Sequence, residues 1–253
     1  MSRLFPELLL MSVVCASAAG CGGPVPTADF TADELVLIRE AASSDGSDSI
    51  PAGTMRVLTV ENEDDLTVLR AKSTDLSEEA LCSEEYSALC SLMVATVTHP
   101  SQDGVGIAGP QVGLNRRVVA VQRFDKEPVS IGGKTDYPFE VYPNIRIVWA
   151  SDSLEPGPEG CLSVPGRRGD VLRSQEIEIE YDIVVAGCET DCEDGCGTEC
   201  KSGCGSGCGT GCETGLSIGA KIQTVREKIE GFTAVIFQHE IDHLEGVLYI
   251  DRL

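Results

Sequence analysis

A helical spacing of hydrophobic residues marks one segment in the first half of the chain. Leu89, Met93 and Val97 recur at intervals of four residues, so they share one face of a helix. Ser83 precedes them and is followed by two glutamates, which is typical of a helix N-terminus. The pattern predicts an amphipathic helix that ends at about Thr98.

A second helical pattern lies close to the C-terminus. Phe232, Val235 and Ile236 fall on one broad face, and the predicted helix runs from about Phe232 to Leu244. Gly246 follows as a residue type that commonly ends helices. A shorter amphipathic piece is expected from about residue 34 to 42.

Alternation of polar and hydrophobic residues predicts strands between these helices. Residues 176–181 alternate strictly, and the pattern resumes at residues 221–226, so the two segments are expected to form a strand pair. The mixture of helices and strands predicts an α+β fold. The strands expected are residues 117–122, 141–149, 173–185 and 221–228.

The C-terminal helix carries a candidate metal site. His239 and His243 lie four residues apart, which places both imidazoles on one face within reach of one cation. Glu240 between them can hydrogen-bond a metal-bound water and take its proton. The same short pattern also arises by chance, as two surface histidines beside a charged neighbour.

Two upstream segments offer further chemistry. Cys161, between turn residues, could supply the third ligand that an open metal site needs, or it could be a small buried core thiol. Residues 104–111 form a glycine-rich turn that ends in the side-chain amide of Gln111. This turn has neither the dinucleotide spacing nor the Gly-Lys-Ser/Thr ending of a nucleotide loop.

In this order, the three segments resemble the signature motifs of the peptide deformylases. Residues 159–163 and 239–243 match the second and third motifs, Glu-Gly-Cys-Leu-Ser and His-Glu-x-x-His, at every specified position. The first motif departs twice, with Ile107 in place of Leu and Gly109 in place of Ala. Gly109 removes a methyl group and is expected to loosen the loop. The likeness runs from about residue 55 to 253.

The resemblance implies antiparallel strands around a central metal-bearing helix. Cys161, His239 and His243 would hold one divalent ion, usually Fe²⁺ in this family, with Zn²⁺ or Ni²⁺ as replacements. The metal-bound water would be the nucleophile and Glu240 the general acid/base. The expected reaction removes the N-formyl group from formyl-methionyl peptides.

The resemblance also assigns residues around the reacting carbonyl. The Gln111 side-chain amide and the Leu162 backbone N–H would meet the developing oxyanion. Val105 and Gly106 would offer backbone hydrogen bonds to an extended peptide, and Arg168 would border the pocket for its first side chain.

The net charge of the chain and its N-terminal segment indicate which partners and which cellular location to expect. A net charge of −22 argues against nucleic acid as a partner. Residues 1–21 are expected to be a signal peptide, because a short positive start is followed by an apolar run and by Ala18-Ala19-Gly20-Cys21, which resembles a lipoprotein lipobox. A lipidated Cys21 would then anchor the protein outside the cytoplasm. The alternative is an untargeted extension and a cytoplasmic protein. Residues 22–52 are expected to be a tether, and residues 53–253 the catalytic domain.

Residues 188–215 form a cysteine-rich repeat within that domain. Twelve cysteines are present, and seven of them recur every fourth residue in this segment. The repeat could be a flexible insert, a disulfide-tied loop that pairs partly with Cys82 or Cys90, or a metal-binding segment. Because it interrupts the predicted strand pair, it is expected to extend from a hairpin tip.

Two rival functions remain open. The chain could be an exported amidase that acts on other small acylated amines, or a non-catalytic surface protein that binds through its cysteine-rich repeat. Glu240 speaks against the second, because metal binding alone would not need it. The sequence does not predict an oligomeric state.

Overall fold

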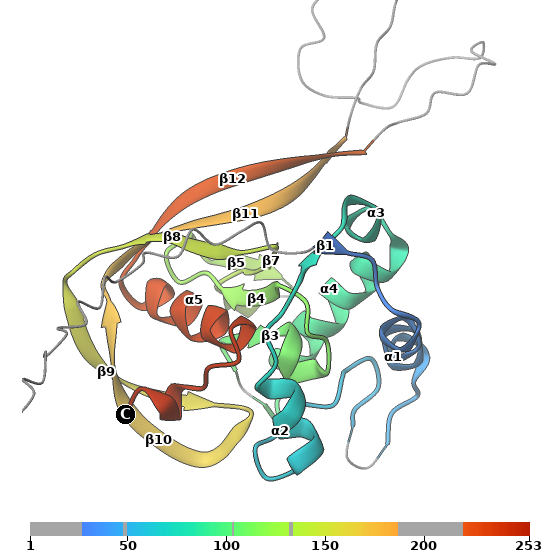
Figure 1. Cartoon of the computed structure of the whole chain (residues 1–253), viewed down its shortest axis with the longest axis horizontal. Helices are drawn as coiled ribbons and strands as arrows, with labels where there is room; N and C mark the ends of the chain where they lie inside the picture. The colour runs from blue at the N-terminus through green and yellow to red at the C-terminus, as the bar shows by residue number, and fades with distance from the viewer. Residues whose placement is uncertain (1–26, 48–49, 103, 132–133, 187–219) are drawn as a thin grey trace, which may run out of the picture.

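A computed structural model describes residues 27–47, 50–102, 104–131, 134–186 and 220–253 (Figure 1). The predicted signal peptide with its lipobox and the cysteine repeat lie outside the described residues, so both stay predictions. No helix in the described part of the chain is long and apolar enough to span a membrane. Cys82, Cys90 and Cys161 are free thiols.

The two predicted long helices are present, because their periodicity is a local property of the sequence. Ser83 caps the first, with its Oγ accepting a hydrogen bond from the Tyr86 N–H at 3.1 Å. Gly246 follows the last with a φ of 72°, a conformation that glycine adopts readily. The helices are α1 (Ala32–Ser43), α2 (Glu63–Leu69), α3 (Glu78–Leu81), α4 (Glu84–Val97) and α5 (Gly231–Leu244), with 3-10 turns η1 (Gly109–Val112) and η2 (Tyr249–Asp251).

The strands form small sheets that are almost entirely antiparallel. One sheet has the order β3-β4-β7, a second β12-β11-β8, and β9 and β10 form a long hairpin. A further hairpin is β5-β6, and the short strands β1 and β2 pair in parallel. Their bounds are β1 (Thr27–Ala28), β2 (Asp75–Leu76), β3 (Gly106–Ala108), β4 (Val118–Gln122), β5 (Val129–Ile131), β6 (Lys134–Asp136), β7 (Phe139–Pro143), β8 (Arg146–Ala150), β9 (Leu154–Cys161), β10 (Val164–Ser174), β11 (Glu176–Ala186) and β12 (Ala220–Glu230).

The single strand predicted at residues 141–149 is wrong. Asn144 interrupts it with a φ of 52°, so β7 ends before this residue and β8 begins after it. The Asn144 amide accepts from the Leu76 N–H at 2.7 Å and donates to the Leu76 carbonyl at 2.9 Å. These bonds to a distant segment stabilise the break, and nothing in the local pattern indicates them.

The prediction of one strand over residues 173–185 is also wrong. Gln175 separates β10 from β11, because its backbone bonds to two other segments. Its N–H donates to the Ser153 carbonyl at 3.0 Å, and its carbonyl accepts from the Gly231 N–H at 2.9 Å. The residues around Cys161 that were expected to form turns lie instead within the strands β9 and β10.

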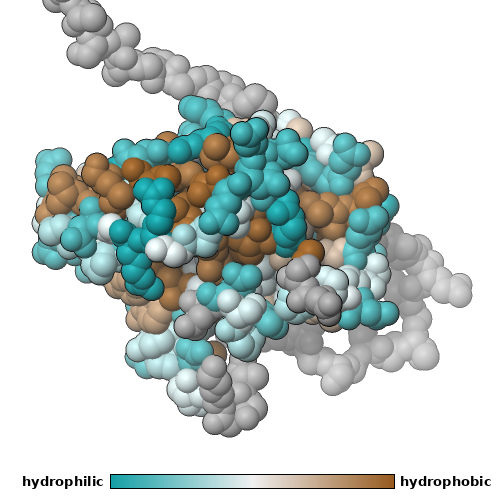
Figure 2. Space-filling model, turned by 90° about the horizontal axis from the view of Figure 1, so that it is seen from below, coloured by the Kyte–Doolittle hydropathy of each residue, from teal (hydrophilic) through white to brown (hydrophobic). Residues whose placement is uncertain are grey.

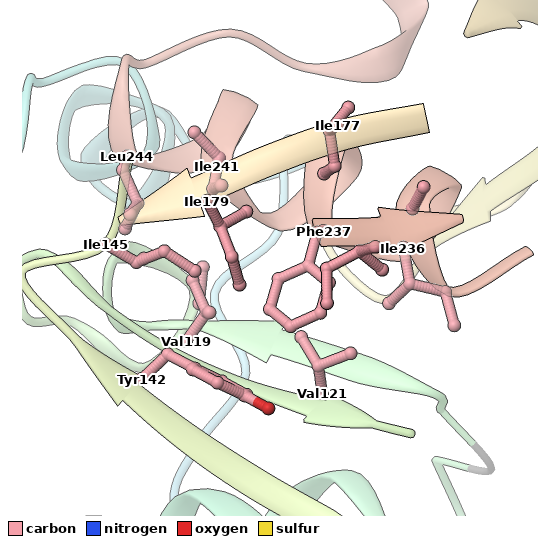
Figure 3. Packing of buried hydrophobic residues seen from close by; sticks show 13 residues of the cluster. Val119, Val121, Tyr142, Ile145, Ile177, Ile179, Ile236, Phe237, Ile241 and Leu244 are labelled. Carbon is pink, nitrogen blue, oxygen red and sulfur yellow. The ribbon is translucent and has the colours of Figure 1, made fainter. Parts of the chain in front are cut away.

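Helix α5 lies at the centre of the molecule, as expected, with the strands around it (Figure 1). Phe237, Ile241 and Leu244 of α5 are buried against the sheets. Figure 3 shows Phe237 of this helix beside hydrophobic side chains of two sheets. Burial of this face holds the other face of α5 toward β9. The labelled strand partners are Val119, Val121, Tyr142, Ile177 and Ile179.

The expected tether between residues 22 and 52 is not free of the domain where the structure describes it. Ile38 of α1 is completely buried, in a cluster that includes Leu89 and Met93 of α4. Glu34 accepts two hydrogen bonds from the buried Arg116 guanidinium, each at 2.8 Å. Helix α1 is therefore packed onto the domain through both apolar and charged contacts.

The predicted strand pair around the cysteine repeat is present. β11 and β12 pair antiparallel without interruption, from Glu176 opposite Glu230 to Ala186 opposite Ala220. The last pair brackets residues 187–219, which lie outside the described part of the chain. Figure 1 shows this ribbon extending away from the body of the molecule, remote from the C-terminal end of β9.

Candidate metal centre

The structure brings three potential metal ligands together. His239 and His243 of α5 have ring centroids 5.1 Å apart, and the end of β9 places Cys161 beside them. The Cys161 Sγ lies 3.2 Å from His243 Nε2. One ligand atom from each of the three residues lies within 4.8 Å of the others.

Glu240 lies directly against the glycine-rich segment. A Cβ at Gly106 would come within 2.4 Å of Glu240 Oε1, so only glycine allows this close approach. Glu240 is 4% exposed, and its Oε2 has no hydrogen-bond partner in the described part of the chain. Burial raises the pKa of this carboxyl to about 7.

The side-chain amide of Gln111 is fixed toward the candidate centre. Its Oε1 accepts from the Ala108 N–H at 2.8 Å, which orients the amide nitrogen. That Nε2 donates to Ser163 Oγ at 3.2 Å and lies 3.5 Å from Cys161 Sγ. Because the amide is already held, little reorganisation is needed for it to donate to a bound oxygen.

A buried carboxylate that the sequence reasoning left without a role orients one of the histidines. Glu159 Oε2 lies 2.7 Å from His239 Nδ1, which leaves Nε2 of that ring for a cation. Arg173 donates to both Glu159 oxygens, at 2.7 and 3.0 Å. Burial opposes ionisation of Glu159, but the bonds from His239 and Arg173 outweigh it and hold its pKa at about 2.

The same network continues to the C-terminal segment. Arg173 also donates to Asp242 Oδ2 at 2.6 Å, and Arg252 donates to that same oxygen at 2.6 Å. Charges therefore alternate from the exposed Arg252 inward to His239. Of the charged partners behind His239, Glu159 is a specified position of a recognised motif, and Asp242 is an unspecified position of another. Arg173, Asp242 and Arg252 carry no signal that pairs them in the sequence.

A cavity of about 750 Å³ opens beside Cys161 and His239. Val105, Gly106 and Arg168 line it, as the resemblance implied. The Val105 carbonyl, however, accepts from the Gln122 N–H at 2.8 Å and so points toward β4. Because backbone groups alternate along a strand, those of Gly106 point away from β4, and it is this residue that can bond a peptide through both groups.

Gly109 does not loosen its loop, contrary to the expectation from the sequence. A Cβ at this position would lie 2.7 Å from the Arg116 carbonyl oxygen and 2.8 Å from that of Leu114. The turn packs so closely against this backbone that the glycine is required. Gly109 is therefore compatible with a well-packed η1 turn, which positions Gln111.

The residues present fit a divalent cation. One thiol sulfur and two imidazole nitrogens form a donor set that transition metals accept, with room for a further ligand from solvent or substrate. Glu240 lines the adjoining cavity, and its unpaired Oε2 would be satisfied by a proton donor bound there.

A family model described as "Polypeptide deformylase" matches residues 55–190 and 218–253, and the gap between the two matches contains most of the cysteine repeat. The chain belongs to the polypeptide deformylase family. The peptide deformylase of Leptospira biflexa is 33% identical over 187 residues, covering 74% of this chain and 82% of that protein. That of Caulobacter vibrioides is 31% identical over 202 residues, with 78% and 87% covered.

Solved deformylase structures have the same fold. The Met-Ala-Ser-bound class I type b peptide deformylase of Acinetobacter baumannii has a TM-score of 0.54 and 26% identity, covering 79% of this chain and 98% of that one. The Thermotoga maritima peptide deformylase, at 24% identity, has a TM-score of 0.53 and covers 79% of this chain. The chain is a metal-dependent hydrolase that removes the formyl group from N-formyl peptides.

Proposed function

We propose that Cys161, His239 and His243 hold the catalytic ion and that this ion is Fe²⁺. The proximity of their three ligand atoms carries the assignment. The choice of Fe²⁺ over Zn²⁺ or Ni²⁺ rests on the family resemblance, because the donor set accepts all three. When bound, a divalent cation supplies Lewis-acid chemistry, in that it polarises a carbonyl and acidifies water.

Glu240 is the general acid/base of the reaction. Its carboxylate accepts the proton of the attacking water and later delivers it to the departing amine. The approach of Gly106 to Oε1 fixes the carboxylate, and the unpaired Oε2 is free to hold the proton. A pKa near 7, raised by burial, suits a group that must both accept and release a proton at neutral pH.

Gln111 and Leu162 stabilise the formyl oxygen as it gains charge. The Gln111 Nε2 is preset beside Cys161, and the Leu162 backbone N–H comes from the next residue of the chain. Donors that are in place before charge develops lower the barrier without reorganisation. Gly106 binds the peptide backbone, and Arg168 borders the cavity beside its first side chain.

The substrate proposed is a formyl-methionyl peptide. In support, the similar A. baumannii deformylase is described with Met-Ala-Ser bound, a peptide that begins with methionine. The test is to load the full chain anaerobically with Fe²⁺, Zn²⁺ or Ni²⁺ and to measure deformylation of formyl-Met-Ala-Ser against acetyl-Met-Ala-Ser. Turnover of the acetyl peptide alone would contradict the deformylase proposal and favour an exported amidase.

The role of Glu240 is tested by Glu240→Gln, which keeps the size of the side chain and removes the proton acceptor. Metal content should be retained, while kcat should fall by about 10²–10⁴-fold. Asp170→Asn, on the exposed face of β10, is the matched control and should leave both unchanged. Turnover near that of the parent in a metal-replete Glu240→Gln variant would remove Glu240 from this role.

The proposed location is the outer face of a bacterial membrane, through lipidation of Cys21. The support is the signal-like segment that ends in Ala18-Ala19-Gly20-Cys21. Cells that express the full chain are fed radiolabelled palmitate and fractionated, beside cells that express Cys21→Ser. Label and membrane recovery should be lost in the variant. An unlabelled parent in the soluble fraction would favour a cytoplasmic protein.

A further inference from the structure

The β9–β10 hairpin has one buried face and one exposed face, because side chains alternate along both strands. The two strands pair without a break from Arg168 opposite Gly160 to Ser174 opposite Leu154. Glu159 and Arg173, on the buried face, belong to the network behind His239. The opposite face carries the other set of residues.

At the end remote from Cys161, that other face carries large apolar side chains that are exposed to solvent. Leu154 is 53% exposed and Leu172 is 60% exposed, and Pro156 between them is also exposed. Leu172 is paired directly with Pro156, so these side chains adjoin across the hairpin. We call Leu154, Pro156 and Leu172 the hairpin platform. Figure 2 shows apolar surface on the side of the molecule where Figure 1 places this hairpin.

The platform is continuous with the substrate cavity along the strand. Pro158 and Gly160 occupy the same face of β9 as the platform, and both line the cavity, as does Arg168 opposite Gly160. Residues 158–161 of β9 line the cavity, and the same strand continues from this wall to the platform. A peptide that leaves the cavity along β9 meets the platform next.

The start of α5, which also lines the cavity, is held close to the platform by backbone hydrogen bonds. Phe232, which is 57% exposed, lines the cavity at the start of α5. The preceding Gly231 N–H bonds the Gln175 carbonyl, and the Gln175 N–H bonds the carbonyl of Ser153. Leu154 follows Ser153, so the cavity wall at Phe232 and the platform at Leu154 are held together at this end.

The length of β9 sets which part of a peptide reaches the platform. Cys161 and Leu154 are seven residues apart in this strand, a span of about 23 Å at a rise of ~3.3 Å per residue. A peptide extended along β9 with its formyl group near Cys161 therefore passes Leu154 at about its seventh residue.

We propose that the hairpin platform binds apolar side chains of the formylated peptide at about its sixth to eighth residues, so that the enzyme prefers N-formyl peptides with an apolar segment there. The inference rests on the proposed substrate being a formyl-methionyl peptide. The occupant is the substrate itself, because the platform continues the wall of its cavity. The gain appears in KM, since the platform lies far from the reacting carbonyl.

The test compares three substrates of the full chain loaded with metal. These are formyl-Met-Ala-Ser, a formyl-Met decapeptide with leucine at positions 6 to 8, and the same decapeptide with serine there. The leucine decapeptide should have a KM about fivefold below that of the serine decapeptide, as partial burial of exposed leucines outweighs the ordering of the peptide. The kcat should be equal for both.

The variant Leu154→Ser/Leu172→Ser should abolish this difference in KM while kinetics on the tripeptide stay unchanged. The matched control is Val36→Ser, at an exposed apolar position (51%) on α1, which should keep the difference. Equal KM values for both decapeptides in the parent, or a preference that survives the double substitution, would overturn the proposal that the hairpin platform binds the peptide. Failure of the parent to turn over the tripeptide would instead overturn the proposed function, and the inference that rests on it.

Discussion

Replacing Glu159 by glutamine should weaken metal binding without removing a metal ligand. Glu159 accepts two hydrogen bonds from Arg173 and one from His239 in a buried setting. Glutamine has the same shape but only one accepting oxygen. If that oxygen keeps the bonds at the Oε2 position, the new NH₂ group faces the Arg173 Nε–H, and two donors oppose one another.

The magnitude follows from what the carboxylate does for the imidazole. A carboxylate that accepts from Nδ1–H makes the other ring nitrogen a better ligand, and loss of such a partner lowers metal affinity by about 10–100-fold. This corresponds to ~1.4–2.7 kcal/mol of binding free energy. The unpaired Arg173 donor should also lower the free energy of unfolding by about 1–3 kcal/mol.

The assay separates these two effects. The Kd of the metal-free protein for Co²⁺ is measured by visible absorption against a competing chelator, and urea unfolding is measured without metal. Glu155→Gln, at an exposed position on the same strand, should leave both quantities unchanged. A Kd within twofold of the parent in a folded Glu159→Gln variant would refute the orienting role of Glu159.

Three further predictions concern the periphery of the domain. Ile38→Ala should lower the free energy of unfolding by about 2–5 kcal/mol, because the side chain is fully buried. The control Val36→Ala, at an exposed position, should change it by less than about 0.5 kcal/mol. Equal effects of the two substitutions in urea unfolding would contradict the packing of α1. Deleting residues 188–215 should leave bound metal and turnover nearly unchanged, since each doubling of loop length costs only about 0.6 kcal/mol; loss of metal from a folded deletion variant would place the repeat in the catalytic machinery. Burial raises the pKa of Glu34, but the hydrogen bonds from Arg116 outweigh it and hold the pKa below its usual value. This carboxylate therefore stabilises the fold above its unfolded pKa of about 4.3, and the contribution is lost as pH falls through the folded value. The unfolding free energies of the parent and Glu34→Gln should differ at about pH 7, and the difference should shrink as pH falls below about 4.3; a difference independent of pH would refute this.

The helices and the strand pair around the repeat could be predicted because their signals are local. The periodicity that marks α4 and α5 lies within the segments themselves, and so does the alternation in β11 and β12. The breaks at Asn144 and Gln175 have no such signal. They are fixed by hydrogen bonds to Leu76, Ser153 and Gly231, which become neighbours only in the folded chain.

The candidate site divides in the same way. His239 and His243 could be predicted from their spacing on one helix, and Cys161 from the resemblance to a family. The network behind them could not be predicted, because Arg173 and Arg252 look like ordinary surface charges in the sequence. Only the fold shows that both converge on Asp242, where charge alternation makes the burial of Arg173 tolerable.

The alternation of β9 explains how one strand can serve both the metal and the substrate. Cys161 and Glu159 point to the buried side, where one supplies a ligand and the other orients His239. Pro158 and Leu154 point to the opposite side, along the cavity wall and beyond it. Substitutions at the buried positions should therefore change metal affinity, and with it the turnover of every substrate alike. Substitutions at the exposed positions should change KM only for peptides long enough to reach them, so the two sets of variants are separable in one pair of assays.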